Sequence, residues 1–244
     1  MFYIEIFIIS TLLSAFFALG GVGSAVALIP VLHWMGIDFN FAKAIGLFVN
    51  TTTTVTATIM NIKRKVLDIK FALPLAISLA AFAPVGAMYS KHVPVHEVKW
   101  FFTLFLFFSG SMILFGKKEQ KFNYNKQWVM IFIGALVGFI SGLLGIGGGA
   151  LLMPVLILLG FDAKKLAVTM SFVIPFSTLT AFLTYLSFVK VNWYILIIAA
   201  LGAIIGGYVG NYFMHFKLNQ SQIKKIIGIL LYIIAFKMIF SLIG

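Results

Sequence analysis

The sequence predicts an all-α membrane protein, a polytopic helical bundle of two inverted four-stretch repeats. Three observations lead to this fold class. The 244 residues are 62% hydrophobic and 10% charged, with a mean hydropathy of +1.10, far outside the range of soluble globular domains. The apolar runs are continuous, whereas the strands of a membrane β-barrel alternate. Finally, the second half of the chain repeats the first.

Eight apolar stretches are long enough, or nearly so, to cross a hydrocarbon core of about 30 Å, which takes roughly 20 helical residues. In order they are 2–37, 41–62, 71–90, 98–116, 127–161, 163–189, 191–216 and 222–243. Four stretches fall in each half. We therefore divide the chain into a first repeat half at 1–116, a basic cytoplasmic linker at 117–126 and a second repeat half at 127–244.

The repeat aligns without a gap when the second half is shifted back by 124 positions. Residues 145–147 (Gly-Ile-Gly) then fall on residues 21–23 (Gly-Val-Gly). Between positions 21 and 57, 13 of 37 residues are identical. Paired halves that carry glycine-broken helices at corresponding positions indicate a transporter with its site where the halves meet.

The first and fifth stretches are predicted to be pairs of short helices, which would give ten helices in all. Stretch 127–161 has 35 residues, about 52 Å as one straight helix and longer than the bilayer core requires. It is interrupted at 145–149, and stretch 2–37 is interrupted at 20–24. Glycine runs unwind helices because glycine loses the most backbone entropy on ordering. A single tilted and kinked helix is the alternative.

The charges between the stretches indicate that the two halves are inverted. If every stretch crosses once, the basic residues divide as nine and eight between the two sides. If stretches 2–37 and 127–161 each return to their side of entry, 13 fall on one side and four on the other. The four lie in charge-poor loops that hold Lys43, then Lys91 with Lys99, then Lys190. The positive-inside rule favours the second arrangement. It places both termini outside the cytoplasm, and it places these loops inside: 61–70, 116–127, 160–165 and 214–225. Re-entrant hairpins and two full crossings both stay open.

The two glycine segments are the first candidate substrate-binding residues. Exposed N–H groups at a half-helix N-terminus bind anions through free donors and a partial positive charge. Non-helical backbone at membrane depth is tolerated inside protein or beside a polar cavity. Close helix packing is the alternative role, and neither segment has the Lys-Ser/Thr of a phosphate loop. The candidates are Gly21, Gly23, Ser24, Gly145, Gly147, Gly148 and Gly149.

Polar residues in the second and sixth stretches complete the predicted site. Most hydroxyls there are expected to bond to carbonyls of their own helix. The Asn50 amide is harder to satisfy in lipid, and its repeat partner Ile174 stands beside Pro175, which is expected to free a carbonyl and break the sixth stretch. We expect Asn50, Thr51, Pro175 and Ser177 to surround one cavity together with the glycines.

Few ionisable residues fall within the stretches. Asp38 and Asp162 each follow a Gly-x pair and are expected to cap helices. Lys237 is the one clearly intramembrane charge, and it is expected to snorkel. No carboxylate lies at mid-span, the histidines lie at stretch ends, and the chain has no cysteine. The sequence therefore predicts no metal, no cofactor and no catalytic site.

These residues resemble the TauE/SafE family of sulfite and sulfonate exporters. The resemblance covers the whole length and rests on the Gly-x-Gly-Gly-Gly segment followed by Leu-Met-Pro-Val-Leu at 145–156, its weaker copy at 21–32, and the two Gly-x-Asp turns. The first copy has Ser24 and Ala25 where the second has Gly148 and Gly149. The resemblance implies a multi-pass protein of the bacterial inner membrane that moves anions containing sulfur.

Together the repeat and the resemblance predict a secondary transporter, not an enzyme, that moves sulfite or a short sulfonate by alternating access. A passive anion channel and a membrane-embedded transferase are the alternatives. The expected partners are a small anionic substrate and the lipid bilayer. A coupling proton or sodium ion and a homodimer stay open. Nucleic acid is not expected, because the basic residues lie in short loops between the stretches.

Overall fold

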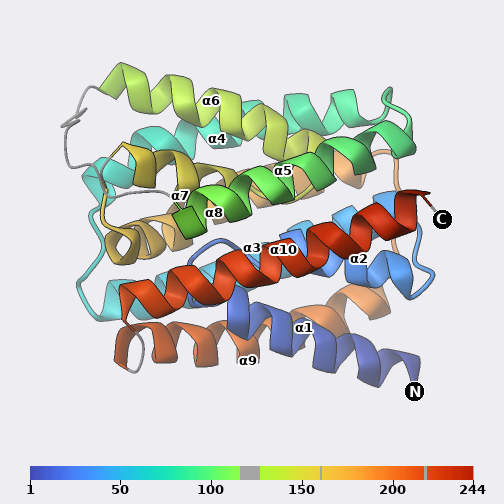
Figure 1. Ribbon diagram of the computed structural model, residues 1–244, viewed down its shortest axis with the longest axis horizontal. Coiled ribbons are helices and arrows are strands. Elements are labelled where there is room, and N and C mark those ends of the chain that lie inside the picture. The colour runs from blue at the N-terminus through green and yellow to red at the C-terminus, as the bar shows by residue number, and fades with distance from the viewer. Residues whose placement is uncertain (116–126, 160, 217–218, 244) are drawn as a thin grey trace.

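The computed structural model of the chain describes residues 1–115, 127–159, 161–216 and 219–243 (Figure 1). These residues form ten α-helices and no strand, which confirms the predicted all-α class. The helices are α1 (Phe2–Ala18), α2 (Ala25–Trp34), α3 (Phe39–Lys63), α4 (Ile69–Ser90), α5 (Val95–Phe115), α6 (Gln127–Leu144), α7 (Gly149–Leu158), α8 (Ala163–Tyr185), α9 (Trp193–Phe216) and α10 (Gln220–Ile243). The predicted linker 117–126 lies outside the described residues.

Five of the described helices are long and apolar enough to cross a membrane, namely α4, α5, α6, α8 and α9. Each presents large hydrophobic side chains on its outer surface, such as Ile77, Leu104 and Leu201. In water an exposed apolar surface of this extent would be costly, whereas lipid tails accept it. The chain is thus a multi-pass membrane protein.

The predicted glycine breaks are present. Stretch 2–37 divides into α1 and α2, with the break at Leu19–Ser24, and stretch 127–161 divides into α6 and α7, with the break at Gly145–Gly148. Each break leaves one helix of 17 or 18 residues followed by one of 10 residues. A single tilted and kinked helix, the alternative, is therefore excluded for both stretches.

The first helix of each half packs against a helix of the other half. α1 packs on α9 rather than on the helices that follow it, and α6 packs on α4. α3 lies against α8 at the centre, and α5 lies against α10. Replacing each helix by its repeat partner converts the α1–α9 contact into the α6–α4 contact. Each half therefore completes the other, because its first helix is buried against the opposite half.

Aspartates are the N-cap residues of three helices, and the sequence predicted two of these caps. Asp38 Oδ1 accepts hydrogen bonds from the N–H groups of Asn40 and Phe41, both at 3.0 Å. Asp162 Oδ1 accepts from the N–H groups of Lys164 and Lys165 at 3.0 and 3.1 Å. These carboxylates satisfy N–H groups that lack an intrahelical partner and complement the positive end of each helix dipole.

The predicted break at Pro175 is wrong, because α8 continues through it from Ala163 to Tyr185. The proline still removes one N–H donor, so the carbonyl four residues earlier, that of Ser171, loses its helical partner. The hydroxyl of Thr58, on α3, donates to this carbonyl. A donor from the neighbouring helix thus satisfies the freed carbonyl, and the helix does not need to unwind.

The two ends of the bundle carry different connections. Both chain termini lie at one end of the long axis, on the right in Figure 1, together with the turns that lead into α3 and α5. The turn between α3 and α4 lies at the opposite end. That turn contains Arg64 and Lys65, and Lys63 and Lys70 flank it. A basic segment therefore lies at the end away from the termini.

Candidate functional site

The two glycine breaks have the same backbone conformation. In the first, the Val22 N–H donates to the Phe17 carbonyl and the Gly21 N–H to the Ala18 carbonyl, each at 3.3 Å. In the second, the Ile146 and Gly145 N–H groups make the corresponding bonds at 3.1 and 3.2 Å. This is the Schellman motif, which ends a helix on a left-handed glycine. Gly21 and Gly145 have φ values of +62° and +74°.

A second left-handed glycine in each break directly precedes the N-cap residue of the next helix, Ser24 or Gly148. Gly23 and Gly147 have φ values of +85° and +71°, a conformation that costs other residues about 1–2 kcal/mol. The N–H groups of Gly23, Ser24, Gly147 and Gly148 have no hydrogen-bond acceptor within the described residues. All four residues are buried. Buried N–H groups are nearly always paired. Each break therefore presents hydrogen-bond donors that a ligand could use.

Asn50 joins the two breaks at the centre of the bundle. It lies one residue before the middle of α3 and is fully buried. Its Nδ2 donates to the Ile146 carbonyl at 3.1 Å, while its Oδ1 has no partner within the described residues. A Cβ built on Gly23 would collide with Asn50 Oδ1, and one built on Gly147 would lie 2.7 Å from Nδ2. Both glycines are therefore required by this close approach as well as by φ.

The central pair α3 and α8 also meets through hydroxyls. The Oγ1 atoms of Thr51 and Thr178 lie 2.7 Å apart, and Thr178 also contacts Gly147 through its methyl group. Gly149 faces the Val22 carbonyl and the side chain of Ile174. Thr51 and Gly147 thus lie close to Asn50. Thr178, which is not among the predicted site residues, lies beside them.

Other predicted site residues lie around this centre in supporting positions. Ser24 Oγ accepts a hydrogen bond from Ser14 at 3.1 Å, and Ser177 donates to the Ile174 carbonyl of its own helix at 3.0 Å. Gly148 packs on Leu79, and Gly21 packs on the Ala167 backbone. These residues, with Pro175, shape the backbone around the centre.

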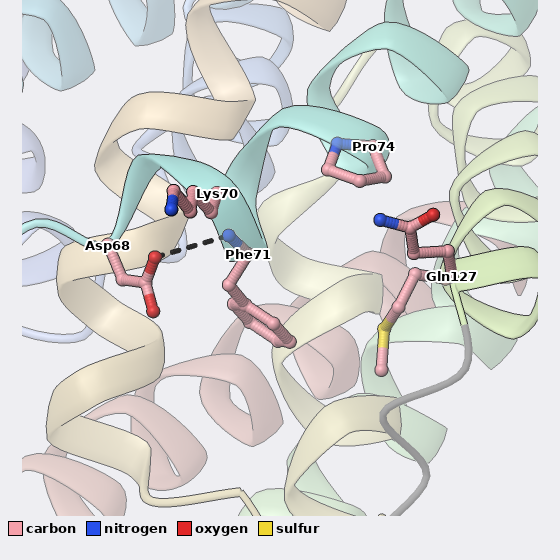
Figure 2. A pocket seen from close by; sticks show the side chains of 6 residues that line it. Asp68, Lys70, Phe71, Pro74 and Gln127 are labelled. Atoms are coloured by element: carbon pink, nitrogen blue, oxygen red, sulfur yellow. Dashed lines mark hydrogen bonds between the residues drawn. The ribbon is translucent and has the colours of Figure 1, made fainter.

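Two cavities between the described helices lie away from this centre. Figure 2 shows one of about 260 Å³ between the beginnings of α4 and α6, lined by Asp68, Lys70, Phe71, Pro74, Gln127 and Met130. The Asp68 carboxylate caps α4 there, accepting from the Phe71 N–H at 3.2 Å. A larger apolar cavity of about 670 Å³ is lined by residues of α4–α7, including Phe105 and Leu144. Neither cavity is lined by Asn50 or the glycines, and the centre is closely packed in this conformation.

The sequence of this chain is similar to those of known membrane proteins. The family described as Sulfite exporter TauE/SafE matches residues 6–238. The chain belongs to this family. It is 28% identical over 250 residues to the probable membrane transporter protein YunE of Bacillus subtilis, covering 91% of each chain. It is 25% identical over 179 residues to a probable membrane transporter protein of Methanocaldococcus jannaschii, covering 70% of this chain and 67% of that protein. It is also 28% identical over 121 residues to Sulfite exporter TauE/SafE family protein 1 of Arabidopsis thaliana, covering 44% of this chain and 26% of that one.

One polar cluster of this TauE/SafE protein contains Lys43, which the sequence analysis assigned to a charge-poor loop. That assignment is wrong, because Lys43 lies in α3 and is fully buried. Its Nζ donates to Ser90 Oγ at 2.8 Å and contacts the Leu143 carbonyl at 3.4 Å. The Tyr185 hydroxyl donates to the same Ser90 oxygen at 3.1 Å. Lys237 is therefore not the one charge within the helices.

A second polar cluster lies at the other end of α3. Asn61 Nδ2 donates to Ser171 Oγ at 2.9 Å, and its Oδ1 lies 2.9 Å from His215 Nε2. Arg64 donates to Asn211 Oδ1 at 2.8 Å. Asn61 is the repeat partner of Tyr185, so the two clusters occupy corresponding places at opposite ends of the central pair. That shift by 124 positions was the signal that could have found them.

Metal ligation has no candidate in the part of the chain that the structure describes. No group of three or more His, Asp or Glu side chains there could hold a metal ion. His92 and His96, which share a helical spacing, are both exposed at the beginning of α5. The available chemistry of the centre is hydrogen-bond donation from backbone N–H groups, one amide and two hydroxyls.

Proposed function

We propose that this TauE/SafE protein is a secondary transporter that moves a small anion, with sulfite or a short sulfonate as the first candidates, across the bacterial inner membrane. The observation that carries the proposal is the meeting of two half-helix N-termini at Asn50, with buried and unpaired N–H groups in both. Free N–H groups and the positive ends of two helix dipoles favour an anion at one place.

The chemistry of the surrounding side chains supports an oxyanion rather than a cation. An oxyanion accepts several hydrogen bonds, and the Thr51 and Thr178 hydroxyls and the Asn50 amide can supply them without a fixed negative charge nearby. The family name adds sulfite as the candidate to test first. A cation carrier would instead call for a carboxylate at the centre, and Asp38 and Asp162 cap helices away from it.

Alternating access between two inverted halves is the mechanism that we propose. The exchanged helix contacts support it, because each half buries the first helix of the other. The position of the α3–α4 turn, opposite the chain termini, is what an inverted arrangement with 13 basic residues inside requires (Figure 1). The close packing around Asn50 corresponds to an occluded conformation, from which either end would open.

Flux into liposomes tests the substrate and separates the rival functions. Purified protein should carry sulfite at a rate that saturates with concentration and that shows counter-flow against preloaded sulfite. Saturation without counter-flow, or flux linear in concentration, would favour a passive anion channel. Flux equal to that of empty liposomes for sulfite, taurine and other short sulfonates would overturn the substrate assignment.

Cysteine labelling tests the inverted topology, and the absence of native cysteine removes background. Lys165 and Lys190 are exposed and lie beside opposite ends of α8. An impermeant maleimide added to intact cells should modify Lys190→Cys and spare Lys165→Cys, while both should react after the membrane is permeabilised. The reverse pattern in intact cells would restore a parallel arrangement. Lys165 is preferred to Asp162, whose side chain caps α8.

A further inference from the structure

Lys43 is a cation enclosed by the bundle. Its side chain is fully buried, and its Nζ lies between the Ser90 hydroxyl, the Leu143 carbonyl and the rings of Phe39 and Tyr185, whose centroids are 5.2 and 5.6 Å away. These are neutral groups. They solvate an ammonium group in part, but none of them cancels its charge.

No carboxylate of the described residues lies within the 4.0 Å of an ion pair with Lys43. Asp38, the nearest preceding acidic residue in the chain, acts on Lys43 only through space, because its carboxylate is exposed and accepts from the N–H groups of Asn40 and Phe41. A buried charge without a counter-ion in direct contact costs several kcal/mol, and within membrane helices such a residue marks a binding site or an ion path by default. The cost calls for a compensating partner.

The position of Lys43 connects it to the central site. The alkyl chain of Lys43 packs on Gly145, where a Cβ would lie 2.7 Å from the Lys43 Cβ and Cγ atoms. The Leu143 carbonyl, which Nζ contacts, belongs to the end of α6 just before the second break. Lys43 precedes Asn50 by seven residues on α3, a rise of about 10 Å along the helix. The ammonium thus lies between the centre and the end of the bundle where α3 begins.

Ser90 and Tyr185 place two hydroxyls beside this ammonium. Ser90 is the last residue of α4, and Tyr185 is the last residue of α8. The Tyr185 hydroxyl lies 3.2 and 3.3 Å from the Gly142 and Leu143 carbonyls. One ammonium and two hydroxyls from three helices form a compact set of donors that matches an oxyanion.

We propose that Lys43, Ser90 and Tyr185 form a second anion subsite, which receives the substrate oxyanion between the end of the bundle where α3 begins and the centre at Asn50. The subsite rests on the proposed transport of an anion and adds where the charge of that anion is neutralised. When the anion arrives, the ammonium exchanges the Leu143 carbonyl for an oxyanion oxygen. The first glycine break lacks this subsite, because the repeat partner of Lys43 is Ala167.

The test compares Lys43→Met with Lys237→Met, using sulfite-dependent thermal stability in detergent and the KM of liposome flux. Lys43→Met removes the buried charge and keeps the length of the chain, so the ligand-free protein should melt at a higher temperature than the wild type. The stabilisation by sulfite should disappear, and KM should rise about tenfold or more, as for one lost charge-assisted hydrogen bond. Lys237→Met should leave both unchanged, since Lys237 is exposed and its ammonium lies over the Trp34 ring.

Wild-type protein that neither binds nor carries any anion would overturn the proposed function itself. Wild-type protein that carries sulfite, with Lys43→Met retaining the same KM and the same stabilisation, would overturn the subsite alone. Unchanged sulfite binding with an altered pH dependence of flux would also overturn it and would assign Lys43 to proton transfer. If Lys43→Met does not fold, Ser90→Ala and Tyr185→Phe serve instead. Each keeps the charge and should raise KM while preserving the maximal rate, and an unchanged KM in both would contradict the subsite.

Discussion

The two glycine breaks share their backbone but not their surroundings. Both end a helix with a Schellman motif and place a left-handed glycine just before the N-cap of the next helix. Around this common shape, Gly21 meets the backbone of Ala167, whereas Gly145 meets the side chain of Lys43. The repeat therefore preserves the geometry of backbone donors, while the charge is supplied from one side only. We infer that shape is the symmetric property of this site and that electrostatics is not.

The amide at the centre shows the same asymmetry. Asn50 contacts both Gly23 and Gly147, while the side chain of its repeat partner Ile174 makes apolar contacts, among them one with Gly149. A single amide thus serves two breaks. Because α3 and α8 meet close to this point through Thr51 and Thr178, a second amide would compete for the same space.

Filling the space beside Asn50 should have the largest effect. Gly147→Val and Gly23→Val would place side chains where the structure holds the Asn50 amide and the Thr178 methyl group. Transport should be abolished while the protein still inserts in the membrane, as measured by liposome flux and by the amount of folded protein. If both breaks serve one site, the two variants should fail equally.

The matched control for these variants is Gly36→Val. Gly36 also has a left-handed φ of +90°, but a Cβ there would meet nothing within 4 Å. It carries the same backbone strain without filling the centre, so its flux should stay near that of the wild type. Equal loss of flux in Gly36→Val and Gly147→Val would mean that strain, and not the site, explains the effect.

Removing the central amide should have the next largest effect. Asn50→Leu leaves the Ile146 carbonyl without its donor at a fully buried position, and it removes a candidate donor for the anion. The melting temperature should fall, since an unsatisfied buried carbonyl costs about 1–3 kcal/mol, and the rate of flux should fall about tenfold or more, as for one lost hydrogen bond to a charged substrate. Thr52→Val is the control, because the Thr52 hydroxyl bonds to the Phe48 carbonyl of its own helix. A wild-type rate in Asn50→Leu would remove Asn50 from the site.

Substituting alanine for Gly21 and for Gly145 should destabilise the protein to different extents. A left-handed alanine costs both variants about 1–2 kcal/mol. Gly21→Ala must also displace backbone, with its Cβ 2.5 Å from the Ala167 carbonyl oxygen, whereas Gly145→Ala meets the alkyl chain of Lys43. The melting temperature of Gly21→Ala should therefore be the lower of the two. The opposite order would mean that Lys43 is held more rigidly than the α8 backbone.

The hydroxyl contact between α3 and α8 should have the smallest effect. Thr178→Val removes one hydrogen bond between the halves, the one at 2.7 Å from Thr51. Interhelical hydrogen bonds in membranes are worth about 0.6 kcal/mol on average, so the melting temperature should fall only slightly. Thr180→Val, which loses a bond within α8, is the control. A large drop for Thr178→Val alone would show that this contact holds the two halves together in the occluded conformation.

Local physics made several features predictable from the sequence. Hydropathy and length indicate membrane helices because the bilayer fixes both. The glycine breaks follow from backbone entropy, and the Asp38 and Asp162 caps follow from the free N–H groups at a helix start. Each of these depends on residues within a few positions of one another, so the chain carries the information without any partner. The family resemblance drew on the same short segments.

Contacts between distant residues decided the rest. The sequence determined where α1 and α6 end, but only the tertiary structure paired them with α9 and α4. It determined that Pro175 frees a carbonyl, but the Thr58 hydroxyl from another helix kept α8 continuous. Lys43 looked like a loop charge beside Asp38, and its burial became visible only with Ser90 and Leu143 placed around it. Propensity and hydropathy act along the chain, whereas burial and hydrogen-bond partnership depend on which helices meet.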